Sequence, residues 1–194
     1  SFMERHLYKD LLAWKRSEDR KPLILRGARQ VGKTYLLEEF GRREFKETLR
    51  LNFEKKPNLG RMFERDFSIK RIIQEIEIEY NTKIDPLNTL IIFDEIQQSS
   101  LAITSLKYFC EEGSSYFIAS AGSLLGLKTG EGSFPVGKVC FLDLYPLHFN
   151  EFLSALGEEK LAFFLSELKT IEPLSENIHQ KCLDYLKYYF CIGG

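Results

Sequence analysis

The chain is poor in the residues from which metal centres and disulfide frameworks are built. It has four cysteines and three histidines among 194 residues, and no two cysteines have the C-x-x-C spacing. The cysteines fall within apolar runs, at Cys110, Cys140, Cys182 and Cys191. This pattern predicts buried free thiols rather than disulfides or metal ligands.

Long apolar runs and an excess of charge of one sign are lacking as well. No apolar stretch approaches the roughly 20 residues that a membrane-spanning helix needs. Lys and Arg number 27 against 28 Asp and Glu, so the formal net charge is −1. A balanced charge provides no overall attraction to nucleic acid or to an anionic membrane. No secretory signal pattern is found before Met3, and the expected location is the cytoplasm.

What the chain does contain is a glycine-rich segment, GARQVGKT, at residues 27–34. It fits the pattern G-x-x-x-x-G-K-[ST] of the phosphate-binding P-loop, which a chain of this length matches by chance about once in a hundred. The preceding PLILR (22–26) predicts a short buried strand, and KTYLLEEF (33–40) predicts a helix that ends at Gly41. Strand, glycine loop and helix are the order that the motif requires. The segment therefore predicts a site for a nucleoside triphosphate with Mg²⁺.

Each part of this segment has an expected role at the phosphates. Gly27 and Gly32 allow close approach of phosphate oxygens, and the N–H groups of the loop point into a concavity at a helix N-terminus, where negative charge is favoured. We expect Lys33 to reach the β- and γ-phosphates and the Thr34 hydroxyl to ligate Mg²⁺. The expected nucleotide-binding residues are Gly27, Ala28, Arg29, Gln30, Val31, Gly32, Lys33, Thr34 and Tyr35. Two alternatives stay open for Arg29 and Gln30: their side chains either cover the phosphates or face solvent. The alternative for the whole segment is a glycine turn that only caps a helix.

An acidic pair follows the apolar run TLIIF at residues 89–93. A continuous run of this kind is typical of a central parallel strand that is buried on both faces. Asp94 and Glu95 come directly after it, in the Walker B pattern. Because such a strand ends beside the P-loop, we expect Asp94 to hold Mg²⁺, directly or through water, and Glu95 to orient and deprotonate the attacking water. Acidic residues after a strand are common in turns, so the P-loop is what gives this pair its functional interpretation.

The other candidate residues at the site do not belong to a recognisable sequence motif. Ser123 follows the predicted strand YFIAS (116–120) and is a candidate for a bond to the γ-phosphate or to the water, with Ser120 as its rival and a turn serine as the alternative. The expected catalytic residues are thus Lys33, Glu95 and Ser123. Hydrolysis also needs a positive group on the γ-phosphate. The available cations, none with a telling spacing, are Arg61, Arg65, Lys128 and Lys138.

Strands and helices alternate along the chain. Further strands are predicted at 48–53 and 138–144, and amphipathic helices at 3–20, 59–67, 68–83, 100–113 and 146–157. This alternation predicts an α/β protein with a doubly wound parallel sheet and a ligand at the carboxyl ends of the strands. Near the end an apolar helical stripe is formed by Cys182, Leu183, Leu186, Tyr189 and Phe190. Since little sequence follows it, we expect this stripe to pack on a partner beyond Gly194.

Four segments in fixed order resemble a known family. They are GARQVGKT, FDEIQ (93–97), AGSLLG (121–126) and YPLHFNEFL (145–153). With them, nearly the whole chain resembles the prokaryotic AAA-like ATPases, in which an ATPase domain precedes a poorly characterised C-terminal domain. The resemblance implies a P-loop NTPase of AAA+ type, with three layers, α/β/α, around a central five-stranded parallel sheet, and with ATP and Mg²⁺ as cofactors.

The resemblance also assigns residues. It implies Lys33 and Thr34 as the Walker A pair and Ser123 as a sensor-like position, with Asp94 and Glu95 as the Walker B pair. One position departs from the pattern, because many relatives carry an arginine before the fifth strand where this chain has a lysine, residue 138. A lysine cannot make the planar two-point contact of an arginine finger.

The expected organisation is an N-terminal helix at 1–20, a P-loop ATPase core at 21–157 and a helical extension at 158–194 that leads to a further C-terminal domain. The leading hypothesis is an ATPase, slow in this segment alone, whose nucleotide state controls that domain or a partner. The alternative is a nucleotide-gated interaction module with negligible turnover. A small-molecule kinase is disfavoured because the loop at 122–137 has no arginine. The expected partners are ATP, the C-terminal domain and a second copy or another protein, with nucleic acid unsupported by charge and no membrane.

Overall fold

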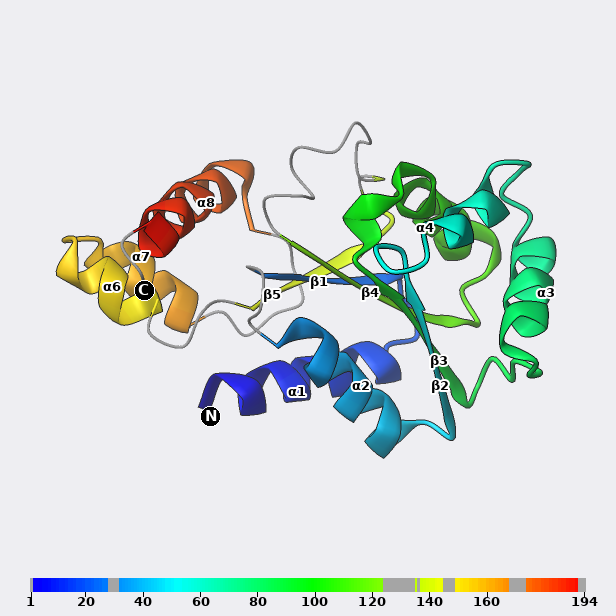
Figure 1. Ribbon diagram of the computed structural model, residues 1–194. Helices are drawn as coiled ribbons and strands as arrows, with labels where there is room; N and C mark the ends of the chain where they lie inside the picture. The colour runs from blue at the N-terminus through cyan, green and yellow to red at the C-terminus, as the bar shows by residue number, and fades with distance from the viewer. Residues whose placement is uncertain are drawn as a thin grey trace.

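The computed structural model describes residues 2–27, 32–123, 135, 137–144, 149–167 and 174–191, with side chains described from residue 7 to 188 within these ranges. Figure 1 shows a sheet with helices on both faces and a separate group of three helices beside it. In chain order the elements are α1 (Phe2–Arg16), β1 (Leu23–Gly27), α2 (Lys33–Glu44), β2 (Glu47–Asn52), the 3₁₀ helix η1 (Pro57–Phe63), α3 (Ile69–Tyr80), β3 (Thr89–Asp94), the 3₁₀ helix η2 (Ile96–Gln98), α4 (Ser100–Glu112), β4 (Phe117–Ser123), β5 (Cys140–Leu144), α6 (Phe149–Ala155), α7 (Glu159–Ser166) and α8 (Glu176–Cys191).

The five strands form one sheet in the order β2-β3-β4-β1-β5, and all neighbouring pairs are parallel. The predicted α/β fold with a five-stranded parallel sheet is confirmed. β1 lies between β4 and β5, so the chain leaves β1 to build the far edge of the sheet and returns to β1 later. In sheets of this kind, ligands bind at the carboxyl ends of strands where the strand order reverses, which here is the end of β1 beside β4.

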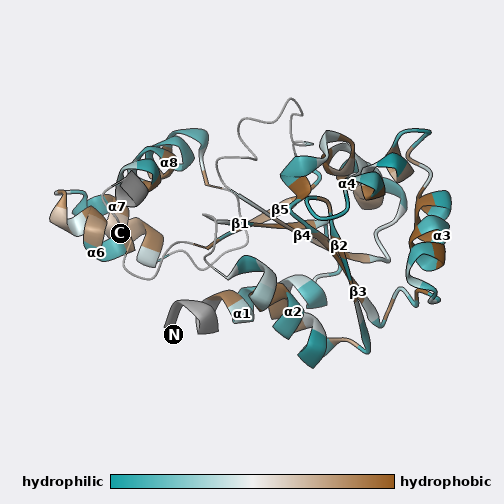
Figure 2. Ribbon diagram, in the orientation of Figure 1, coloured by the Kyte–Doolittle hydropathy of each residue, from teal (hydrophilic) through white to brown (hydrophobic). Residues whose placement is uncertain are grey.

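Two apolar clusters fill the space between the sheet and its helices. One contains side chains of α1 and α2, and the other contains side chains of η1, α3 and α4. β3 contributes to both, because Leu90 and Ile92 face the α2 side while Ile91 and Phe93 face the α4 side. This double burial is why the segment is a continuous apolar run. Figure 2 shows the corresponding pattern, with hydrophobic colour on the sheet and hydrophilic colour on the outer sides of the helices.

Local signals start and stop the helices on the α4 side of the sheet. The hydroxyl of Ser68 accepts from Arg71 N–H at the start of α3, and Ser99 accepts in the same way from Ala102 N–H at the start of α4. α3 ends where Asn81 takes left-handed angles, with φ 48°. These caps define both ends of α3 and the start of α4.

Four predictions of element bounds are wrong, and for two of them a contact with a neighbouring strand gives the reason. The N-terminal helix ends at Arg16 and not at residue 20. α2 continues through Gly41 to Glu44, because this glycine lies against β2, where a Cβ would be 2.3 Å from Thr48 Oγ1. β4 continues to Ser123, since its last residues pair with the end of β1. The expected helix at 59–67 is the shorter 3₁₀ helix η1.

The last three helices bury a cluster of their own, separate from the two sheet clusters. It consists of Phe149, Leu153, Leu161, Ala162, Cys182, Leu183 and Leu186. The expectation that the α8 stripe packs on a partner beyond the chain is therefore wrong for Cys182, Leu183 and Leu186, which are buried against α6 and α7. The side chains of Tyr189 and Phe190 lie outside the described residues. α6, which precedes residue 157, shares this cluster with α7 and α8, and the division into a core and an extension stays a prediction.

The cysteines and the helices bear on two further expectations. The three cysteines whose side chains are described have free thiols, as predicted. The prediction that they are buried is right for Cys182 and wrong for Cys110 and Cys140, which are half-buried; the side chain of Cys191 is outside the described residues. Among the helices that the structure describes, none has the length and apolar character to cross a membrane.

Candidate nucleotide-binding site

The two described ends of the P-loop come close together. β1 ends at Gly27, and Gly32 begins α2 with φ 87°, a left-handed angle that only glycine adopts without strain. The Lys33 side chain is buried and donates from Nζ to the carbonyl oxygen of Gly27 at 3.1 Å. Four of the expected binding residues, Ala28, Arg29, Gln30 and Val31, lie outside the described residues. Tyr35 is on α2 and exposed.

The carboxylate of Asp94 is the centre of the site. The Thr34 hydroxyl donates to its Oδ1 at 2.9 Å, and the N–H of Glu95 donates to the same oxygen at 3.0 Å. Its Oδ2 accepts from Arg50 Nε at 2.8 Å and from Asn52 Nδ2 at 3.3 Å. The Asp94 side chain is only 2% exposed, so water cannot solvate its carboxylate. These four donors supply the hydrogen bonds that water would provide at the surface.

Sheet register explains why these residues meet. β2 and β3 are parallel, and Asn52 at the end of β2 lies opposite Asp94 at the end of β3. Leu49 and Leu51 face the α4 side of the sheet. The residues that alternate with them, Arg50 and Asn52, therefore face the α2 side, where Thr34 lies in the first turn of α2. Thr34 and Asp94, which the sequence predicts as Mg²⁺ ligands, thus lie in hydrogen-bond contact. Arg50 and Asn52 were not expected at the site; the available signal was the two polar residues that alternate with leucines at the end of a strand.

Arg50 bridges two carboxylates. Its Nη2 is 2.6 Å from Asp94 Oδ2, and its Nη1 is 3.1 Å from Oε1 of Glu38 on α2. Burial by itself would lower the pKa of the guanidinium, but the hydrogen bonds and charges of Asp94 and Glu38 outweigh burial and raise the pKa above its ordinary value. Arg50 therefore stays charged and supplies the counter-charge for the buried Asp94.

Glu95 has an unusual backbone. Its φ of 53° and ψ of 47° are left-handed, which is uncommon for a residue with a side chain and costs about 1–3 kcal/mol. This conformation ends β3 and turns the chain into η2. The Glu95 carboxylate accepts from Gln97 Nε2 at 2.5 Å, and Gln97 was a further residue that the sequence did not single out for the site. Strained backbone of this kind is concentrated at functional sites.

The two candidate serines occupy different depths of β4. Ser123 is the last residue of the strand, lies opposite Gly27 and is partly exposed. Ser120 is fully buried opposite Ile24 and Phe93. Of the two serines, only Ser123 therefore lies at the carboxyl end of its strand, next to the start of the P-loop.

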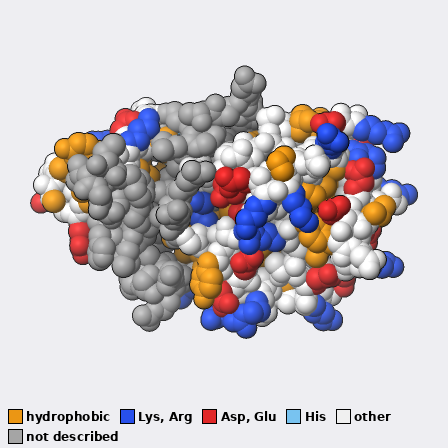
Figure 3. All heavy atoms as spheres, viewed as in Figure 1, with side chains coloured by type: hydrophobic (Ala, Val, Ile, Leu, Met, Phe, Trp, Pro, Cys, Tyr) orange, Lys and Arg blue, Asp and Glu red, His pale blue; other side chains and the backbone are white. Residues whose placement is uncertain are grey.

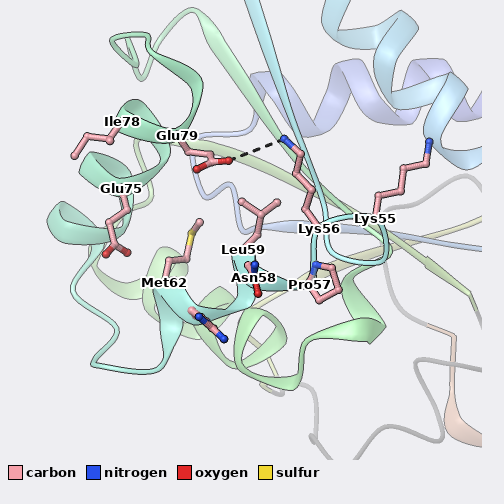
Figure 4. Close-up of a pocket in the computed structure, with 10 residues that line it drawn as sticks. Lys55, Lys56, Pro57, Asn58, Leu59, Met62, Glu75, Ile78 and Glu79 are labelled. Atoms are coloured by element: carbon pink, nitrogen blue, oxygen red, sulfur yellow. Dashed lines mark ion pairs between the residues drawn. The ribbon is translucent and has the colours of Figure 1, made fainter.

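Of the candidate cations, the three that the structure describes are not among the residues that bond Asp94. Lys138 pairs with Glu111 at 3.3 Å, Arg65 is largely exposed, and Lys128 is outside the described residues. Arg61 lines a groove of about 720 Å³ between residues 55–62 and α3, which Figure 4 shows in close-up. None of the residues around Asp94 lines this groove.

The surface and the donor set limit the possible ligands. In Figure 3 the blue and red side chains are interspersed over the described part of the visible face, so no broad basic surface is seen there. Within the described residues no group of three or more His, Cys, Asp and Glu side chains gathers to hold a metal. A hydroxyl and a carboxylate in contact, Thr34 and Asp94, do suit Mg²⁺, which usually takes one or two protein oxygens together with phosphates and water.

The chain is similar to known proteins in both sequence and structure. The family model described as "AAA domain" matches residues 19–153, which is more than half of the chain. The chain belongs to this AAA domain family. No curated protein sequence matches it.

The solved structures that resemble the chain include the following two. Caenorhabditis elegans PCH-2 is 12% identical with a TM-score of 0.50, over 84% of this chain and 48% of that one. The Aeropyrum pernix ORC1 protein, solved in complex with DNA, is 11% identical with a TM-score of 0.42, over 94% of this chain and 64% of that one. The chain thus spans less than two thirds of either protein. PCH-2 supports the P-loop NTPase fold, and the family makes this AAA chain a nucleotide-binding domain of ATPase type.

Proposed function

We propose that this AAA domain binds ATP with Mg²⁺ and hydrolyses it, and that its nucleotide state controls an attached C-terminal domain or a protein partner. The observation that supports this most directly is the contact of 2.9 Å between Thr34, in the first turn of α2, and Asp94, at the end of β3. This contact brings the end of the P-loop and the acidic pair into one site, as nucleotide hydrolysis by a P-loop protein requires.

The binding roles follow from the donors at the start of α2. The ammonium of Lys33, which now bonds the Gly27 carbonyl, would turn to the β- and γ-phosphates. Backbone N–H groups and the dipole of α2 favour the same negative charge. Thr34 and Asp94 are the residues that would hold Mg²⁺, which neutralises phosphate charge when it is bound.

The catalytic roles fall to residues at the ends of β3 and β4. Glu95 would accept a proton from the attacking water, because it follows Asp94 directly and its carboxylate is held in place by Gln97. Ser123 would bond the γ-phosphate or the water from the end of β4, opposite Gly27.

A second candidate function is a nucleotide-gated interaction module with negligible turnover. It is favoured by the occupancy of both acidic side chains, because Arg50 bonds Asp94 and Gln97 bonds Glu95. A protein that keeps these contacts when nucleotide is bound would change conformation with ATP but would not activate water.

Nucleotide binding is tested first. Lys33→Ala should weaken binding of a fluorescent ATP analogue with Mg²⁺ about a hundredfold, because it removes charge-assisted bonds worth about 3 kcal/mol in total. Lys46→Ala, which truncates an exposed lysine before β2, is the control and should bind like wild type. Equal affinity of Lys33→Ala and wild type would show that the site is assigned wrongly.

Turnover is tested second, in the full-length protein. Glu95→Gln should bind ATP normally and release phosphate about a hundredfold or more slowly than wild type, because it removes a general base. Glu39→Gln, which changes a partly exposed carboxylate of α2 paired with Arg42, should leave the rate unchanged. If wild type binds ATP and releases no phosphate, the interaction module replaces the enzyme.

A further inference from the structure

Asp94 already has a cationic partner. Arg50 places Nε at 2.8 Å and Nη2 at 2.6 Å from the same oxygen, Oδ2. Thr34 bonds the other oxygen, Oδ1. The carboxylate that is proposed to hold Mg²⁺ is therefore neutralised by the chain itself. Burial of a carboxylate to this extent is costly without a nearby positive charge, and the guanidinium of Arg50 supplies that charge.

Arg50 also has a second carboxylate within reach. Glu38 Oε1 lies 3.1 Å from its Nη1, and the side chains of Glu38 and Arg50 are 45% and 36% exposed, against 2% for Asp94. The guanidinium thus lies between a buried carboxylate and an open one. It can give up its bonds to Asp94 and remain paired with Glu38 without becoming an isolated buried charge.

We propose that Arg50 is a positioning residue that holds Asp94 in the absence of a divalent cation and yields it, while staying on Glu38, when Mg²⁺ and nucleotide bind. This inference rests on the proposed function. A guanidinium and a divalent cation compete for one carboxylate, because each lowers the negative potential that attracts the other. Arg50 therefore sets the concentration of Mg²⁺ at which the nucleotide complex forms.

The first test titrates Mg²⁺ into the protein with a fluorescent ATP analogue. Arg50→Gln should lower the half-saturating Mg²⁺ concentration about tenfold, since one positive charge beside Asp94 is lost. Arg50→Lys keeps the charge and should stay close to wild type, which separates the charge from any packing defect. Arg42→Gln removes an equal charge from an exposed arginine of α2 that is paired with Glu39, and it should not shift the midpoint.

The second test uses Glu38. Glu38→Gln leaves Arg50 with Asp94 alone and should raise the half-saturating Mg²⁺ concentration. In the Arg50→Gln background the same substitution should have little effect, because the competitor is already absent. The double-mutant cycle thus distinguishes action through Arg50 from a direct effect of the Glu38 charge on Mg²⁺, which would be additive.

A third measurement needs neither nucleotide nor activity. In EDTA without nucleotide, Arg50→Gln should lower the melting temperature relative to wild type and to Arg42→Gln, because Asp94 loses its counter-charge.

Several results would overturn the inference. They are an unchanged Mg²⁺ midpoint in Arg50→Gln, an additive cycle with Glu38→Gln, or a loss of nucleotide affinity that is equal in EDTA and in Mg²⁺, which would mean that Arg50 contacts phosphate. If wild type binds no nucleotide at all, the proposed function fails together with this inference. If wild type binds, Lys33→Ala does not, and Arg50→Gln has the wild-type midpoint, the inference alone fails.

Discussion

Asp143→Asn should destabilise the sheet beneath the P-loop. Arg26 and Asp143 lie opposite each other on β1 and β5, and they form a two-point pair, with Nε to Oδ1 at 2.7 Å and Nη2 to Oδ2 at 2.9 Å. Their side chains are only 9% and 6% exposed, and the guanidinium also stacks 4.2 Å from the ring centre of Phe141. The substitution leaves this buried guanidinium without a carboxylate, one residue before Gly27.

The magnitude follows from the burial of the pair. Removing one partner of a buried ion pair costs about 3–5 kcal/mol, because the other charge stays buried without compensation. The asparagine oxygen can still accept one hydrogen bond, worth about 1 kcal/mol. We therefore expect a loss of about 3 kcal/mol in the free energy of unfolding, which for a chain of this size lowers the melting temperature by roughly 6–12 °C.

Trp14 provides the assay. It is the single tryptophan of the chain, it is buried, and its ring packs 5.9 Å from that of Phe117 on β4, so its fluorescence follows the unfolding of the sheet. Urea denaturation followed by this signal should give a lower midpoint with an unchanged slope. The control is Glu111→Gln, which breaks the exposed pair with Lys138 and should cost less than about 1 kcal/mol.

A second variant decides what the loss means. Replacing both partners, as in Arg26→Met with Asp143→Leu, removes the two charges together and should recover most of the stability. The reasoning would be refuted if Asp143→Asn lost less than about 1 kcal/mol, or if the double variant were as unstable as the single one.

Three further predictions concern stability. Gly41→Ala should cost about 1–3 kcal/mol in urea denaturation, because its Cβ would meet Thr48 Oγ1 at 2.3 Å, and adding Thr48→Ala should restore most of the loss; a stabilising Gly41→Ala would contradict this. Ser120→Ala should change stability by less than about 0.5 kcal/mol, since its buried hydroxyl has no hydrogen-bond partner among the described residues, and a larger loss would indicate a partner. Arg71→Gln should lower the melting temperature at neutral pH and less so in acid. The backbone N–H of Ser68 and, to a lesser degree, Arg71 lower the pKa of Asp66. The ionised Asp66 therefore contributes stability above the ordinary aspartate pKa, and this contribution is lost as the pH falls through the lowered pKa. An equal difference in melting temperature at both pH values would exclude this cause.

The strand and helix pattern was largely predictable, because apolar periodicity is local. The run at 89–93 lies in β3, and its apolar residues alternate between the two apolar clusters, as expected for a strand buried on both faces. Boundaries were less predictable. Gly41 is typical of a helix end, but here it allows α2 to pass close to β2. The α8 stripe looked unpartnered along the chain, and it is buried by α6 and α7, which precede it.

The sequence by itself determined where the phosphate loop lies and which acidic pair accompanies it. Both motifs, the P-loop at 27–34 and the apolar run before Asp94, consist of consecutive residues. Their expected chemistry can therefore be recognised from the residue order alone. Only the tertiary structure decided which side chains bond Asp94. Arg50 is 44 residues away in the chain, and it meets Asp94 because β2 pairs with β3 in the one register that sets Asn52 opposite it. Strand register depends on long-range pairing, which local periodicity does not specify.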